Sequence, residues 1–173
     1  MKTLEVRRHT MRVKQGKHLS QDGVALARRV GGETGPFARV VTSTVPRAFE
    51  TAIAMGFAVD EELDELSTMP EAVEDEYDWQ SGFEAAAQAV AQGGAAAKFA
   101  RSQAKLWKSI AQSVPDGGAA LAITHGGIVE LGAAGCLPEF DFRRWGESCS
   151  YCEGVRLSFD GQKFVGAQLL RVV

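Results

Sequence analysis

Three stretches of the chain share one pattern: a short apolar run, then polar residues, then a segment with helical periodicity. The first begins with TLEV at residues 3–6, which predicts a strand, and continues into LSQDGVALARRVGG at residues 19–32. There Ser20 suits a helix N-cap, apolar residues recur at helical spacing from Val24 to Val30, and Gly31-Gly32 predicts the helix end. We therefore predict a strand that leads into a helix.

The same pattern returns twice. In ARVVTSTVPRAFETAIAMG, residues 38–56, an apolar run at 40–42 precedes polar residues, and Pro46 suits the first turn of a helix. In GGAALAITHGGIVELGAAG, residues 117–135, a continuous apolar run ends at Thr124 and a helical pattern follows. Each stretch predicts another strand-to-helix junction.

Between and after these junctions lie two further patterns. Residues 80–114 have a helical apolar stripe, formed by Phe99, Leu106, Ile110 and Val114. The segment GVRLSFDGQKFVGAQLLRV, residues 154–172, has two alternating runs around an Asp160-Gly161 turn, which predicts a hairpin.

Strands that alternate with helices predict an α/β fold. We expect a three-layer α/β/α sandwich, with a mainly parallel central sheet, helices on both faces and an antiparallel edge hairpin near the C-terminus. Residues 1–173 are expected to form a single domain with a helical insertion at about residues 80–114.

Four polar residues stand where the predicted strands end: Arg8, His9, Arg47 and His125. In open α/β sheets, ligands bind beyond the carboxyl ends of the strands. Guanidinium groups and helix N-termini both bind phosphate oxygens. A histidine among arginines tends to stay neutral, so it can attack phosphorus and form a phosphohistidine.

The distribution of charge fits a small anionic ligand. The formal net charge is −3, but residues 1–47 have ten Lys/Arg and three Asp/Glu, whereas residues 48–97 have twelve acidic and no basic residues. This acidic block would repel a polyanion over much of the surface, so we expect no nucleic-acid partner.

The apolar runs are too short to cross a membrane, and the first residues lack the apolar core of a signal peptide. The three cysteines, Cys136, Cys149 and Cys152, are few and odd in number, which favours a reducing compartment and a cytoplasmic location. We interpret the CSYC motif as buried structural thiols rather than a zinc or redox site, and no other group has metal-ligand spacing.

Four motifs in this order resemble those of the histidine phosphatase superfamily, the phosphoglycerate mutase-like group. They cover the chain from residue 3 to about residue 130, and they are VRRHTMR, LSQDGVALA, STVPRAFETA and AITHGGIV. The resemblance implies a phosphomonoester hydrolase of the histidine acid phosphatase type. We expect it to need no metal and no cofactor, since the arginines supply the charge that a metal would.

By the same resemblance, His9 is the nucleophile, and Arg8, Arg47 and His125 bind the phosphoryl group, with His125 also counted as catalytic. One position departs from the family pattern, because Thr10 stands where a glycine is usual.

The general acid is less clearly marked. In the family it commonly lies in an L-x-E segment, which favours Glu65 in LDEL at residues 63–66, and three other candidates are Glu62, Glu71 and Glu74. Arg12, in the loop at residues 11–18, is a possible substrate-binding residue.

The substrate is left open by the sequence, as a small phosphorylated molecule or a phosphoprotein. Three alternatives to a general phosphatase remain: a protein phosphohistidine phosphatase, a phosphoglycerate mutase-like mutase and a catalytically inactive phosphate-binding module. The oligomeric state is not predicted.

Overall fold

A computed structural model describes all residues 1–173, which form a six-stranded sheet with the order β3-β2-β4-β1-β5-β6. The strands are β1 Lys2–Arg8, β2 Arg39–Thr42, β3 Glu61–Glu62, β4 Ala119–Thr124, β5 Gly154–Phe159 and β6 Phe164–Leu170. The first four strands run parallel to one another, whereas β5 pairs antiparallel with both β1 and β6. The predicted parallel sheet and edge hairpin are confirmed.

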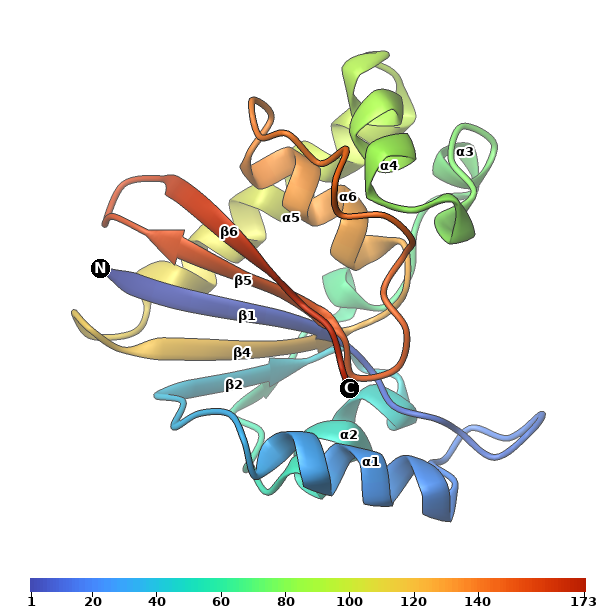
Figure 1. Cartoon of the computed structure of the whole chain (residues 1–173), viewed down its shortest axis with the longest axis vertical. Coiled ribbons are helices and arrows are strands. Elements are labelled where there is room, and N and C mark those ends of the chain that lie inside the picture. Colours follow the sequence, from blue (N-terminus) through green and yellow to red (C-terminus); the bar gives the residue numbers. More distant parts are fainter.

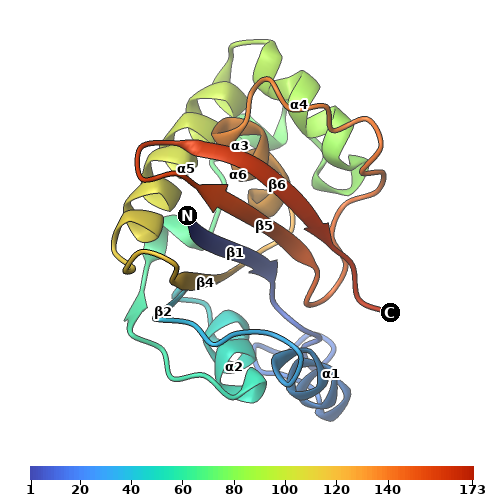
Figure 2. The same cartoon turned by 60° about the vertical axis from the view of Figure 1, so that its left-hand side comes forward.

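Helices cover both faces of the sheet (Figure 1). The α-helices are α1 Gln21–Gly31, α2 Pro46–Met55, α3 Glu71–Glu74, α4 Phe83–Ala91, α5 Ala95–Gln112 and α6 Ile128–Cys136. Two short 3-10 helices are η1 Asp64–Leu66 and η2 Trp79–Ser81. Figure 2 shows α1 and α2 on one side of the sheet and α3 to α6 on the other, as the three-layer prediction requires.

Strand β4 shows how the sheet separates two apolar layers. Ala120 and Ala122 face the layer of α5 and α6, whereas Leu121 and Ile123 face that of α1 and α2, and all four are fully buried. This alternation follows from the two-residue period of a strand. A strand buried on both faces is therefore apolar throughout, which explains the continuous apolar run in the sequence.

The helical segment expected at about residues 80–114 is two helices, α4 and α5, which break at Gly93-Gly94. Gly93 has a φ of 77°, a left-handed conformation that glycine adopts without strain. Trp107, which the predicted stripe omitted, is fully buried, and its Nε1 donates to Gln103. A Cβ on Gly132 of α6 would lie 2.2 Å from the Trp107 ring, so this glycine lets α5 and α6 approach closely.

None of the helices combines the length and the apolar character that a membrane span requires.

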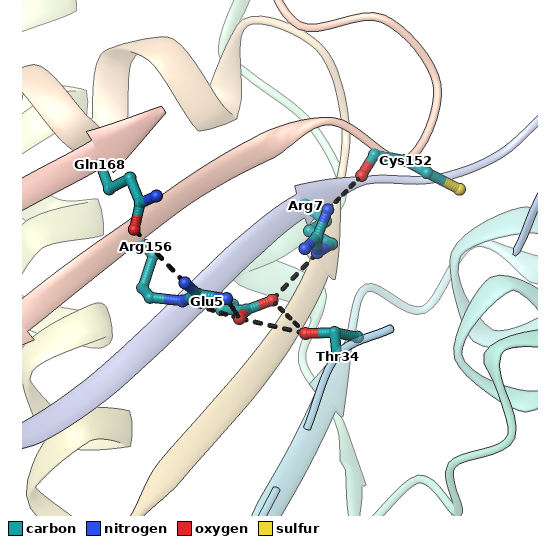
Figure 3. Close-up of polar contacts among 6 residues, drawn as sticks. All are labelled: Glu5, Arg7, Thr34, Cys152, Arg156 and Gln168. Carbon is teal, nitrogen blue, oxygen red and sulfur yellow. Dashed lines mark hydrogen bonds and ion pairs between the residues drawn. The ribbon is translucent and has the colours of Figure 1, made fainter. Parts of the chain in front are cut away.

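A buried charged cluster lies on the central strand β1. Glu5 is 2% exposed, and its side chain accepts hydrogen bonds from Arg7 Nε at 3.0 Å, from Thr34 Oγ1 and from Arg156 of β5 (Figure 3). Arg7, itself 6% exposed, also donates to the Cys152 carbonyl. The carboxylate thus joins β1, β5 and the segment after α1.

We predict that Glu5→Gln lowers the free energy of unfolding by about 3 kcal/mol, because it leaves the buried Arg7 without its counter-charge. Denaturant unfolding measures this change. Glu61→Gln is the matched control, since Glu61 pairs with Arg39 at the surface and should matter by less than about 1 kcal/mol. Equal effects of the two substitutions would contradict the role of the cluster.

Candidate active site

The parallel register places three strand ends side by side. Arg8, the last residue of β1, lies opposite Thr124, the last residue of β4, and Thr42 of β2 lies opposite Ile123. The residues that follow these strands therefore enter one region of space. A cavity of about 430 Å³ opens there, and its lining includes the five predicted residues Arg8, His9, Arg12, Arg47 and His125.

His9 is held in a defined tautomer. Its side chain is buried, and its Nδ1 donates to the carbonyl of Thr10 at 2.7 Å, because a carbonyl oxygen can only accept. The lone pair therefore lies on Nε2, which accepts a hydrogen bond of 3.1 Å from Arg47 Nε. The lone pair of His9 Nε2 thus faces the guanidinium group of Arg47, a type of side chain that binds phosphate in proteins.

His125 lies next to His9, with ring centroids 5.1 Å apart. Its Nε2 is 2.8 Å from the hydroxyl of Ser43, which follows β2, and its Nδ1 is buried without a partner. Ser43 was not predicted as a site residue, although it lies in the polar stretch after the second apolar run. It fixes the orientation of His125 by this contact.

Both histidines are neutral in the folded protein at pH 7. Burial lowers the pKa of His9 to about 3, with further lowering by the charges of His125, Arg47 and Arg8, against the bond to the Thr10 carbonyl. Burial also lowers the pKa of His125 to about 4, and Arg47 and Arg8 add to the effect. A neutral imidazole can act as a nucleophile, and cationic guanidinium groups beside it can bind an anion.

Arg8 is fixed between two aromatic rings. Its guanidinium carbon lies 4.3 Å from the centroid of the Tyr151 ring and 4.9 Å from that of Trp79. Its Nη1 donates to the carbonyl of Cys149 at 3.2 Å. Tyr151 was not predicted as a site residue, because only its position between two cysteines marked it in the sequence.

The CSYC motif supplies Tyr151, which packs against Arg8, and its two cysteines form no disulfide. Cys149 and Cys152 are free and buried, as the structural interpretation predicted, and Cys136 is free and half-buried. Cys149 packs in the apolar cluster on the α5 and α6 side, whereas Cys152 packs in that of α1 and α2. The two thiols thus belong to opposite faces of the sheet.

Thr10 fits its position without backbone strain, since its φ is not positive. The residue is fully buried, its N–H donates to Thr51 Oγ1 of α2 at 3.0 Å, and its own hydroxyl donates to the Gly23 carbonyl of α1. The threonine therefore ties the turn after β1 to both helices. Only the bond from the hydroxyl depends on the threonine side chain, since a glycine at this position would also donate its N–H to Thr51.

The four candidate acids lie at different places. Glu65 is exposed in η1 and outside the cavity lining, and its backbone carbonyl accepts from Gln103. Glu62 lines a separate shallow hollow with His18 and Glu50, and Glu71 is exposed outside the cavity. Glu74, at the end of α3, is the one carboxylate that lines the cavity.

Known proteins are similar to this chain in sequence pattern and in fold. The family model for the histidine phosphatase superfamily (branch 1) matches residues 2–169. A phosphoserine phosphatase of Entamoeba histolytica, solved with 3-phosphoglyceric acid, has a TM-score of 0.71 at 16% identity, over 99% of this chain and 98% of that chain.

Two further structures are similar over nearly their whole length. A mycobacterial glucosyl-3-phosphoglycerate phosphatase has a TM-score of 0.64 at 16% identity and covers 100% of both chains. A phosphoglycerate mutase of Bacillus anthracis has a TM-score of 0.61 at 16% identity, over 94% of this chain and 90% of that chain. A search of curated proteins finds no match. At such identities the structural likeness shows the fold alone.

The low histidine pKa values predict a loss of stability in acid. The unfolded chain binds protons at imidazoles with a pKa near 6.5, whereas the folded protein resists protonation down to about 4 or 3. The stability that these histidines contribute is present above pH 6.5 and is lost as the pH falls, by up to about 1.4 kcal/mol per pH unit for each. The free energy of unfolding, measured with denaturant between pH 7 and 4, should fall less steeply with pH in His9→Gln and in His125→Gln than in wild type. An unchanged slope in both variants would contradict the shifts.

Proposed function

The chain belongs to the histidine phosphatase superfamily, and we propose that it hydrolyses phosphomonoesters through a phosphohistidine on His9. The observation that carries this proposal is the state of His9. Its Nδ1–H is bonded to the Thr10 carbonyl, and its Nε2 lone pair lies in a cavity with Arg8, Arg47 and His125.

In the first step, the His9 Nε2 lone pair forms a bond to phosphorus, and the bond from phosphorus to the ester oxygen breaks. Arg8 and Arg47 bind the non-bridging phosphoryl oxygens and stabilise their charge in the transition state. Arg47 Nε, which bonds to Nε2 in the free protein, donates to a phosphoryl oxygen instead. His125, which Ser43 holds in place, makes a further polar contact to the phosphoryl group.

The leaving oxygen needs a proton, which a carboxylic acid at the cavity can supply. A proton donor acts only within hydrogen-bond reach of the reacting group or through one water, and Glu74 lines the cavity whereas Glu65 does not. We therefore propose Glu74 as the general acid in place of Glu65. In the second step its carboxylate accepts a proton from the water that attacks phosphorus, which releases inorganic phosphate and restores neutral His9.

The rest of the cavity accommodates the leaving group. Arg12 lines the cavity from the loop after β1, and Met69 and Trp79, from the segment between β3 and α4, form an apolar part of its wall. We propose that Arg12 contacts the substrate away from the reacting phosphorus. The relatives act on phosphoserine and on glucosyl-3-phosphoglycerate, and a small phosphorylated molecule of this kind is the substrate class we propose.

We predict that rapid quenching of a reaction with an aryl phosphate, at neutral to alkaline pH, traps a phosphoryl group on the peptide containing His9. Mass spectrometry identifies the modified residue, and His9→Ala should abolish both labelling and turnover. Phosphate on a Ser or Asp would refute the mechanism. Binding of phosphate without any turnover would favour the inactive phosphate-binding module.

The acid assignment predicts a dependence on the leaving group. Glu74→Gln should slow hydrolysis of an alkyl phosphate by roughly 10²- to 10⁴-fold and affect nitrophenyl phosphate much less, because nitrophenolate leaves without a proton. Glu65→Gln is the matched control, since it removes an exposed carboxylate outside the cavity. If Glu65→Gln shows this pattern and Glu74→Gln does not, Glu65 is the acid.

A further inference from the structure

A buried carboxylate lies directly behind the anion-binding loop. Glu130 is in the first turn of α6, which begins just after the loop residues His125, Gly126 and Gly127. Its side chain is 0% exposed and forms no ion pair, and its carboxylate oxygens accept from the Gly127 N–H, at 3.2 and 3.4 Å. Burying an unpaired carboxylate is costly, so its presence next to a functional loop requires a reason.

The loop that Glu130 supports has little freedom to move. A Cβ on Gly126 would lie 2.6 Å from the Trp79 ring, and one on Gly127 would lie 2.7 Å from Met69. Trp79 in turn lies on Arg8. The Gly127 N–H therefore joins the carboxylate to a rigid wall of the cavity.

The charged and titratable groups around Glu130 come from four separate segments of the chain. Arg8 of β1 and Arg171, which follows β6, place positive charge near it, and Tyr77 and Cys149 are neutral neighbours with raised pKa values. Burial raises the pKa of Glu130 to about 7, against the lowering effects of the Gly127 N–H, of its own backbone N–H and of the two arginines. The nearby positive charge of Arg8 is one that the phosphoryl group also uses.

We propose that Glu130 is a positioning residue that binds a proton when an anion enters the cavity. The Glu130 carboxylate then offsets the positive charge of Arg8 when the cavity is empty, and the ligand offsets it when the cavity is occupied. A dianion on Arg8 cancels the positive charge that favours ionised Glu130. The carboxylate then becomes protonated and still accepts the Gly127 N–H through its carbonyl oxygen. By linkage, protonation of Glu130 must strengthen anion binding by the same factor.

This inference deepens the proposed function and rests on the same cavity, but it requires only anion binding and not turnover. The probe is inorganic sulfate, which remains a dianion near neutrality, and its dissociation constant is measured by calorimetry at about pH 5.5 and pH 8.5. Glu130→Gln keeps the acceptor for Gly127 and removes the charge. Glu139→Gln is the matched control, since Glu139 is exposed and outside the cavity lining.

Sulfate should bind wild type and Glu130→Gln equally at the lower pH, where Glu130 is protonated. At the higher pH it should bind Glu130→Gln about 3- to 10-fold more tightly than wild type, the factor expected for a pKa shift of up to about one unit. Any protonation of His9 and His125 beside bound sulfate affects both proteins equally. The ratio of their two dissociation constants for sulfate therefore reports on Glu130 alone. Glu139→Gln should follow wild type at both values.

If the ratio of the sulfate dissociation constants of wild type and Glu130→Gln is the same at both pH values, the role of Glu130 is overturned and the phosphohistidine mechanism is unaffected. Failure of wild type to bind sulfate at either pH would overturn this inference and the phosphoryl site together. If Glu130→Gln does not fold, carboxyl-carbon NMR of wild type decides. The Glu130 resonance should titrate near neutrality and at a higher pH with sulfate, and an identical titration with and without sulfate would refute the proposal.

Discussion

The parallel hydrogen-bond ladder between β1 and β4 is the constraint on which the site depends. It sets Arg8 opposite Thr124, and the residue that follows each of these strands is a histidine. The two imidazole ring centroids are 5.1 Å apart although 115 residues lie between them in the chain. A shift of one residue in this register would turn one strand's side chains to the opposite face. The buried Glu5 cluster ties the same strand to β5 and to the segment after α1.

The site concentrates positive charge without a contacting counter-ion, and the surrounding contacts explain how the fold tolerates it. Arg8 lies between two aromatic faces, which attract a cation without neutralising it. The histidines avoid further charge by remaining neutral, at the expense of stability in acid. The Arg8 guanidinium group is therefore held in place by its surroundings, and charge fixed in this way is what electrostatic catalysis uses.

The sequence predicted the parts of the molecule that follow from local patterns. Arg8, His9, Arg47 and His125 each adjoin a strand-to-helix junction, and such junctions of a parallel sheet meet at one edge, so their convergence follows from the sequence pattern alone. Ser20 acts as the expected N-cap, accepting from the Gly23 N–H. The break between α4 and α5 was missed because alanine-rich sequence continues on both sides of Gly93-Gly94.

The remaining site residues could not be inferred, because their positions depend on tertiary contacts of irregular segments. Between residues 56 and 82 only short elements form, so no periodicity shows which carboxylate turns toward the cavity, and Glu74 could not be separated from Glu65. Tyr151 reaches Arg8 because the loop after α6 returns to the end of β1, where the Cys152 N–H donates to the Arg8 carbonyl. Glu130 occupies an otherwise apolar buried helix, and its polarity was the one available signal. A charged residue that breaks an apolar helical pattern next to a functional loop should therefore be treated as part of the site, because its burial must be offset by what it contacts there.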